Sequence, residues 1–384
     1  MFERTRNLQL SIIKQMEIRA VKYPDVISLA QGIPSFDTPL GIKRRVEKAL
    51  ARGVVAKYSL VPGLPELREL IEISLAQEKM FYDWQKEIIV TAGSIEGITA
   101  AILAITSPGD EVILLDPTYT SYKEVVLLAG CQPIFVPLDE SKNWGLNIEK
   151  LEKAITPKTR AILFCNPNNP TGTVLGKQQL LAIGELAKQH KFFILADEVY
   201  KDFLYNDEPF FSLAQEPGLR QWVIRFFSFS KSYAMTGWRV GYLHSDEKNT
   251  AEILKVHDSL VTCAPVISQY AAMGAMEMGE SDREGFKQEY LKRRRLMCSR
   301  LDKLKNIFEY IKPSSSYFVF PSFKQDSGGS WDFALELLDK ARVAVVPGIA
   351  FGSNGENHIR LSFGRSQLDI EKAFDRLDKC CKNF

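Results

Sequence analysis

The sequence lacks the patterns that mark several common kinds of site. Its six cysteines show no CxxC spacing and its four histidines lie far apart, so neither a disulfide framework nor a metal site is expected. It contains neither GxGxxG nor GxxxxGK[ST], which argues against a dinucleotide site and against a phosphate-binding P-loop. Any site in this chain must therefore be built from other residues.

Charge of one sign and long apolar runs are also missing. Lys and Arg number 49 against 47 Asp and Glu, and this balance argues against a nucleic-acid partner, which needs clustered positive charge. The basic run 292–295 lies in a charged stretch and is interpreted as a solvated helix face. No apolar run of 18 residues occurs, and the first residues do not resemble a signal peptide. We expect no membrane partner and a cytoplasmic location.

What is present is an alternation of short apolar runs with longer amphipathic segments. The runs are rich in β-branched and aromatic residues, which is typical of buried strands. They cover residues 87–93, 111–117, 132–138, 160–167, 191–198, 222–230 and 239–245. Helical segments are expected between several of them, at 95–106, 119–129, 148–155 and 178–190. Strands alternating with helices predict an α/β fold with a mainly parallel sheet.

The pattern changes near residue 280, which suggests a second module. A long charged helix is expected over 281–305, then short strands at 317–321, 343–346 and 357–362, and a last helix over 367–382. The length of 384 residues also favours two domains.

Several predicted strands end in polar residues, and in open α/β sheets ligands bind outside the carboxyl ends of the strands. The run FFILAD ends in Asp197, whose burial would be costly without a cationic partner. A protonated pyridine nitrogen would be such a partner, and the pair would keep the ring an electron sink. Taken alone, Asp197 is better explained as a turn or helix-cap residue.

A second polar group follows the run WVIRFFSFS. Lys231 could form an imine with an aldehyde, and Ser228 and Arg239 could hold a phosphate. A lone lysine after a strand is usually solvated, but SxSK followed by TGWRxGY is far more specific. Ser94 begins a helix after a Gly-Ser turn, where free N–H groups suit a phosphate or where Ser94 is a simple cap.

Three further residues have both an ordinary and a functional interpretation. Asn169 lies in NPNNPTG, which is either a plain loop or a source of a hydrogen bond to a ring hydroxyl. Tyr119 is either a packing residue or a platform for a flat ring. Arg360 lies in an apolar strand and needs an anion, for which a protein carboxylate is the first choice.

Taken together and in this order, these segments resemble the class I/II aminotransferases, which are fold-type I pyridoxal 5′-phosphate (PLP) enzymes. The resemblance extends from GIPSFDTP at 32–39 to HIRLSF at 358–363. It implies a large domain with a mainly parallel seven-stranded sheet and a smaller α/β domain built from both chain ends. The expected limits are 1–45 for the N-terminal arm and part of the small domain, 46–279 for the large PLP-binding domain, and 280–384 for the rest of the small domain.

The resemblance also implies a role for each matching residue. Lys231 would carry PLP as a Schiff base and shuttle a proton as general acid and base. Asp197 would pair with the pyridine nitrogen, and Tyr119 would stack on the ring. Asn169 and Tyr200 would hydrogen-bond the ring's 3′-oxygen.

The phosphate would lie among Ser94, the amide of Ile95, Ser228 and Arg239. Tyr58 would reach that phosphate from a second subunit, which implies a homodimer with shared active sites. Gly32, Asn169 and Arg360 would hold the substrate α-carboxylate.

The expected reaction moves the amino group of an L-amino acid to a 2-oxo acid. Ile33 and Ser35 replace acidic residues that many relatives carry, and Ile95 cannot contact a distal carboxylate as a lysine there would, so a neutral or aromatic side chain is favoured. A carbon–sulfur β-lyase on the same scaffold would share these motifs and stays open. An effector-sensing regulatory protein is a weaker alternative, because such proteins carry an added DNA-binding domain.

Overall fold

The centre of the structure is one twisted sheet of seven strands. The computed structural model describes residues 5–6, 8, 10–206, 208–278, 280–324 and 328–381. The strand order is β2-β8-β7-β6-β5-β3-β4, and β8 alone runs antiparallel to its neighbours. The strands are β2 (Ile88–Thr91), β3 (Glu111–Asp116), β4 (Gln132–Pro137), β5 (Thr159–Cys165), β6 (Phe193–Asp197), β7 (Val223–Ser228) and β8 (Gly241–His244). Six of the seven predicted apolar runs contain one of these strands, and the seventh, 160–167, covers β5 except for Thr159, so the mainly parallel sheet is confirmed.

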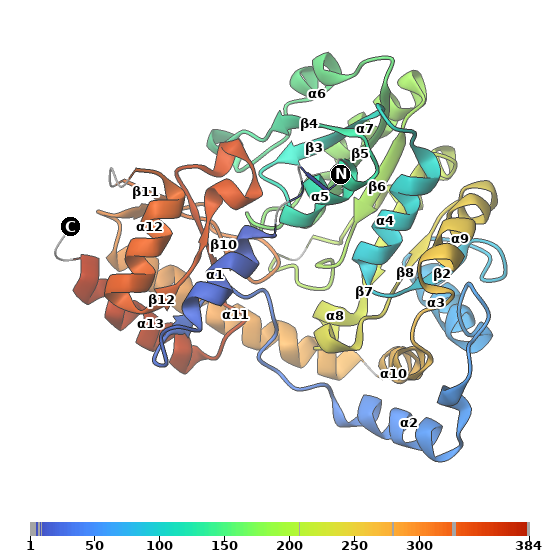
Figure 1. The fold of residues 1–384 in the computed structure, drawn as a ribbon, viewed down its shortest axis with the longest axis horizontal. Helices are drawn as coiled ribbons and strands as arrows, with labels where there is room; N and C mark the ends of the chain where they lie inside the picture. Colours follow the sequence, from blue (N-terminus) through green and yellow to red (C-terminus); the bar gives the residue numbers. More distant parts are fainter. Residues whose placement is uncertain are drawn as a thin grey trace.

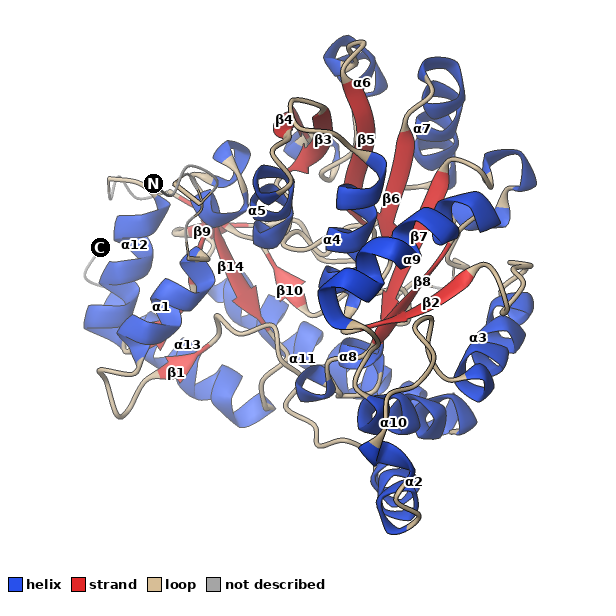
Figure 2. Ribbon diagram, turned by 45° about the vertical axis from the view of Figure 1, so that its right-hand side comes forward, coloured by secondary structure: helices blue, strands red, loops and turns tan. Residues whose placement is uncertain are grey.

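Helices surround this sheet, as Figure 2 shows. They are α3 (Pro65–Gln77), α4 (Ser94–Ile105), α5 (Thr120–Leu128), α6 (Ile148–Ala154), α7 (Lys177–His190), α8 (Phe229–Ser232), α9 (Glu247–Val261) and α10 (Val266–Glu277). Helix α4 packs closely on the sheet, because a Cβ at Gly97 would lie 3.0 Å from Thr91 and 3.3 Å from Leu243. The side chains of Leu243 and Phe226 therefore mark the sheet face that α4 covers.

The second module lies beside the sheet and is built from segments near both ends of the chain (Figure 1). Strand β1 (Ile27–Ser28) pairs in parallel with β12 (Val343–Ala344), so the N-terminal arm is joined to the C-terminal part. The other elements are α1 (Ile12–Ala20), α11 (Glu280–Lys303), β9 (Phe308–Glu309), β10 (Phe318–Val319), β11 (Ser322–Phe323), α12 (Ser330–Glu336), β13 (Val346–Pro347), β14 (Ile359–Ser362) and α13 (Gln367–Cys381). The second module and its origin from both ends agree with expectation.

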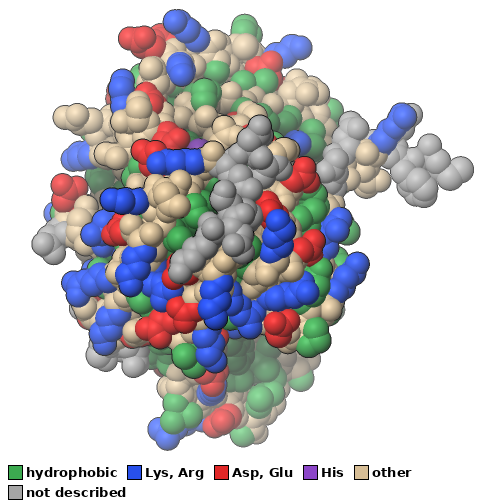
Figure 3. Space-filling model, turned by 90° about the vertical axis from the view of Figure 1, so that its left-hand side faces the viewer, with side chains coloured by type: hydrophobic (Ala, Val, Ile, Leu, Met, Phe, Trp, Pro, Cys, Tyr) green, Lys and Arg blue, Asp and Glu red, His purple; other side chains and the backbone are tan. Residues whose placement is uncertain are grey.

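Helix α2 (Leu40–Ala51) crosses the expected limit between residues 45 and 46, and it packs against α10. The domain limits themselves stay a prediction. Among the described residues, no helix has both the length and the hydrophobicity of a membrane span. Basic and acidic side chains alternate over the face in Figure 3.

Candidate active site

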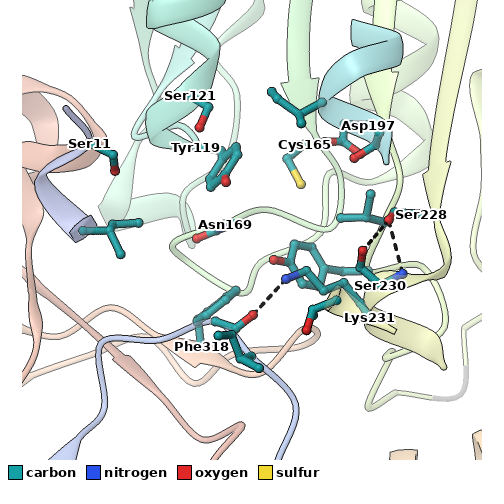
Figure 4. A pocket seen from close by; sticks show the side chains of 18 of the residues that line it. Ser11, Tyr119, Ser121, Cys165, Asn169, Asp197, Ser228, Ser230, Lys231 and Phe318 are labelled. Carbon is teal, nitrogen blue, oxygen red and sulfur yellow. Dashed lines mark hydrogen bonds between the residues drawn. The ribbon is translucent and has the colours of Figure 1, made fainter. Parts of the chain in front are cut away.

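A cavity of about 420 Å³ lies where the carboxyl ends of the central strands meet the second module. It brings together every residue predicted for the site except Tyr58. Those that line it are Gly32, Ser94, Ile95, Tyr119, Asn169, Asp197, Tyr200, Ser228, Lys231, Arg239 and Arg360. Figure 4 shows Asp197, Ser228 and Lys231 on one side of this cavity, with Tyr119 and Phe318 facing them. Residues that are up to 328 positions apart thus share one hollow.

Lys231 enters the cavity from α8, the short helix that directly follows β7. Its Nζ donates a hydrogen bond to the carbonyl of Gly32, at 2.8 Å, and has no carboxylate partner among the described residues. Burial, together with the positive charges of Arg360 and Arg239, lowers the pKa of Lys231 to about 8. A lysine with this pKa is partly neutral near pH 8, which is the form that attacks an aldehyde.

Asp197 ends β6 and lies at the cavity wall. Its Oδ2 accepts a hydrogen bond from the Tyr122 hydroxyl at 2.6 Å. Its Oδ1 is buried and has no hydrogen-bond partner in the described part of the chain. Burial raises the pKa of Asp197 to about 7, against the opposing effect of Tyr122. A buried carboxylate oxygen without a donor is costly, so it fits a ligand that brings an N–H.

Arg360 is buried on β14 and has no carboxylate partner among the described residues, contrary to the ordinary interpretation of its sequence context. Its Nη1 donates to Asn169 Oδ1 at 3.0 Å and its Nη2 donates to the carbonyl of Ala30. Its Nε is buried without a partner, and the guanidinium lies 4.4 Å from the Phe318 ring centre. Burial lowers the pKa of Arg360 to about 10. This cation is therefore open to a ligand carboxylate.

The opposite end of the cavity forms a cradle for an anion. Ser94 is the first residue of α4, and Ser228 caps α8, where its Oγ lies 2.9 Å from Ser230 Oγ. Gly93 has a φ of +82°, and a Cβ there would lie 2.4 Å from Arg239 Nη2. Only glycine therefore lets the Arg239 guanidinium lie against this turn. Free N–H groups, hydroxyls and a guanidinium are the donors that bind a phosphate.

Comparison with known proteins agrees with this geometry. The chain matches the family described as aminotransferase class I and II over residues 24–377. It is 37% identical to a probable N-acetyl-LL-diaminopimelate aminotransferase of Bacillus subtilis, over 98% of this chain and 94% of that protein. It is 35% identical to aromatic-amino-acid aminotransferase 2 of Thermococcus litoralis, over 97% of each chain. The structure of aspartate aminotransferase from Thermus thermophilus with maleate matches with a TM-score of 0.92 and 31% identity, over 99% of each chain.

The chain belongs to the class I and II aminotransferases.

As a member of this aminotransferase family, the protein depends on PLP. Its cavity fits that cofactor. The free Oδ1 of Asp197 matches a pyridinium N–H, the cradle at Gly93 matches the 5′-phosphate, and the Lys231 amine matches the aldehyde. PLP supplies an aldehyde that condenses with amines and a ring that accepts electrons from the substrate.

Several cavity residues were not predicted. Tyr122, Cys165, Ser230 and Phe318 line the wall near the predicted residues, and Ser230 could have been found from its place in SxSK. Ser121, Val199 and Thr236 also line the cavity, and a further group from α1 and the residue before it comprises Ser11, Ile13, Lys14 and Glu17. Nothing in their local sequence signals this, because it depends on how the second module docks.

Tyr58 lies outside the cavity of its own chain. Its side chain is 84% exposed, beside a hollow formed by residues 55–58 and 263–266. Arg239, at the cradle, is also exposed. The predicted role of Tyr58 needs a second copy of the chain, so it stays a prediction.

Proposed function

We propose that this aminotransferase moves the amino group of an L-amino acid with a neutral or aromatic side chain to a 2-oxo acid. One observation carries the proposal. Three groups converge on one cavity: a lysine of low pKa, a carboxylate oxygen without a donor, and an arginine without an acid. They suit, in turn, an aldehyde, a pyridinium ring and an α-carboxylate.

In this proposal each predicted cavity residue has its own role toward the cofactor or the substrate. Bound PLP would supply an aldehyde for amines, with loss of water, and a ring that accepts electrons. Lys231 would hold its aldehyde end and, once freed, would accept or donate the proton at the substrate Cα. Asp197 would keep the ring nitrogen protonated, and Tyr119 would lie against the ring. Asn169 and Tyr200 would hold the 3′-oxygen. Ser94, the Ile95 amide, Ser228 and Arg239 would hold the phosphate. Arg360, with Asn169 and the main chain of Gly32, orients the α-carboxylate so that the Cα–H faces Lys231.

The choice of donor is supported by the cavity wall. Ile13, Ile33 and Ile95 give it apolar surface. The one cation that α1 adds, Lys14, is already paired with Glu17 at 2.9 Å. A distal carboxylate on the substrate would meet Glu17 as well as Lys14, so an acidic donor is disfavoured. The relatives are named for aspartate, aromatic and diaminopimelate substrates and do not decide between donors.

The test is a visible spectrum of the holoenzyme while L-amino acids are added singly, without an oxo acid. We expect the yellow band to disappear with neutral or aromatic donors, with one oxo acid released per site. Aspartate as by far the best donor would overturn the choice of substrate. A persistent yellow band with accumulating ammonia and pyruvate would instead indicate a β-lyase.

We also propose that two copies share their active sites through Tyr58, whose exposed position supports this. Chains carrying Tyr58→Ala and chains carrying Lys231→Ala would each be impaired alone. A mixed dimer would hold one intact site and regain about half of the wild-type activity. No recovery on mixing would contradict a shared site.

A further inference from the structure

The segment that follows β6 has two sides. Asp197 and Tyr200 line the cavity, whereas Glu198 and Lys201 do not. Glu198 is buried and pairs with Arg225, and Lys201 pairs with Glu78 at 2.7 Å and with Asp202 at 3.1 Å. The sequence DEVYK thus combines three cavity residues, Asp197, Val199 and Tyr200, with two members of a charged cluster, Glu198 and Lys201.

Arg225 lies at the centre of this cluster, in the middle of the otherwise apolar strand β7. Its side chain is fully buried. Its Nε donates to Glu198 Oε2, its Nη2 lies 3.5 Å from Glu78 Oε2, and its Nη1 lies 3.3 Å from His244 Nε2. Glu198 Oε1 also accepts from the Ser212 hydroxyl at 2.7 Å. Both oxygens of Glu198 are therefore held by residues that do not line the cavity.

This cluster occupies the sheet face that α4 does not cover. Arg225 and Phe227 alternate along β7 with Phe226, which faces α4. The same face carries Tyr242 and His244 of β8, whose neighbour Leu243 also faces α4. Burial and the charge of Arg225 hold the pKa of His244 well below its usual value, so the ring is neutral. The charge that balances Glu198 therefore comes from Arg225.

We propose that Arg225 is a positioning residue, which acts through Glu198 to hold Asp197 against the cofactor ring. The link through the chain is short. Glu198 N donates to the carbonyl of Phe226 at 3.0 Å, and Asp197 pairs with Phe226 across the two strands that end in Asp197 and Ser228. Arg225 also neutralises the second of two adjacent carboxylates, which leaves Asp197 as the one that faces the ring nitrogen.

The inference rests on PLP binding, not on the choice of donor, and can be tested without turnover. Apoprotein would be titrated by fluorescence with PLP and with its analogue that carries carbon in place of the ring nitrogen. The wild type should prefer PLP, because the analogue offers Asp197 no N–H. In Arg225→Met the ratio of the affinity for PLP to the affinity for the analogue should fall about tenfold, which is the scale of one charged hydrogen bond. The affinity for the analogue itself should stay nearly unchanged.

A double variant separates positioning from stability. Arg225→Met alone leaves Glu198 buried and unpaired, which will destabilise the fold. Glu198→Gln/Arg225→Met removes both charges, so the thermal midpoint should largely recover while the preference for PLP stays low. Arg300→Met is the matched control, since Arg300 is also largely buried and pairs with Asp375 and Asp378 at 2.7 Å in the second module. Its preference for PLP over the analogue should equal that of the wild type.

Two outcomes would overturn the proposal. One is an equal loss of affinity for both compounds in Arg225→Met. The other is a double variant that recovers the preference for PLP together with its stability.

Discussion

Two largely buried lysines follow neighbouring strands, one in the cavity and one outside it, and their surroundings differ. For Lys201, burial would lower the pKa, but Asp202 and Glu78 outweigh this and the pKa is raised. For Lys231, burial prevails and the pKa falls to about 8. The two fully buried arginines divide in the same way, because Arg225 has Glu198 and Glu78 while Arg360 has no acid among the described residues.

The difference shows that burial of a cation does not by itself identify a functional residue. The paired cations, Arg225 and Lys201, contribute to the structure behind the site. The unpaired ones, Lys231 and Arg360, lie in the cavity, where a ligand can supply the missing partner. The following experiments test this division, in order of expected effect.

Replacement of Lys231 should give the largest loss. In the proposed function, Lys231→Ala removes both the amine that holds the cofactor and the group that moves the Cα proton, so turnover should fall by about 10⁴-fold or more. The measurement is steady-state transamination by protein with a normal circular dichroism spectrum. Substantial remaining activity would contradict the role of Lys231.

Replacement of Arg360 should come next. Arg360→Gln removes the charged partner of the α-carboxylate, which should lower kcat/KM by about 10²–10³. Arg360→Lys restores the positive charge but not the paired N–H donors of the guanidinium, so it should recover only part of the lost kcat/KM. Stopped-flow decay of the cofactor band gives the rate of the first half-reaction. A glutamine variant that reacts with amino acids as fast as the wild type would contradict the role of Arg360 as the partner of the α-carboxylate.

Matched changes in the two lysines should shift stability in opposite directions. In the apoprotein at pH 7, Lys201→Met removes the cation beside Asp202 and leaves Glu78 with Arg225 alone, and it should lower the free energy of unfolding by about 3 kcal/mol. Lys231→Met removes an unpaired buried cation and should raise it by about 1 kcal/mol. Urea denaturation measures both. The same sign for both variants would show that the pairing of these cations is unimportant.

The pH dependence of cofactor uptake should be the smallest effect. The neutral amine of Lys231 accumulates as the pH approaches about 8, whereas an exposed lysine would need about pH 10.4. The rate at which apoprotein forms the yellow complex with PLP should therefore rise about tenfold per pH unit below 8 and become constant above it. A rate that still rises at pH 10 would show that the environment does not lower this pKa. The folded apoprotein should also gain stability from pH 8 to 10.4, because the unfolded chain then binds more protons.

Much of this architecture could be predicted because it depends on local patterns. Buried strands appear as short apolar runs, and the polar residue after each run points to the common edge of the sheet, where Asp197, Asn169 and Lys231 do meet. Strand β1 was missed because it has only two residues, and its pairing with β12 joins segments about 316 positions apart.

The unpredicted parts depend on contacts between distant segments. Lys14 and Glu17 reach the cavity only because α1 docks against it. Arg225 looks like an anomaly in an apolar strand until Glu78 and Glu198 are seen around it. In both cases the local sequence gives the charge but not the partner.

The hydrogen bond from Lys231 to the Gly32 carbonyl links two parts of the chain that lie far apart in the sequence. This bond joins Lys231, on the short helix that directly follows β7, to the N-terminal arm. If Lys231 holds the cofactor aldehyde as proposed, the Gly32 carbonyl would still accept a hydrogen bond from the Tyr317 hydroxyl, at 3.0 Å. In the proposed function the same lysine would thus serve in turn as a link between two distant segments of the chain and as the attachment point of the cofactor.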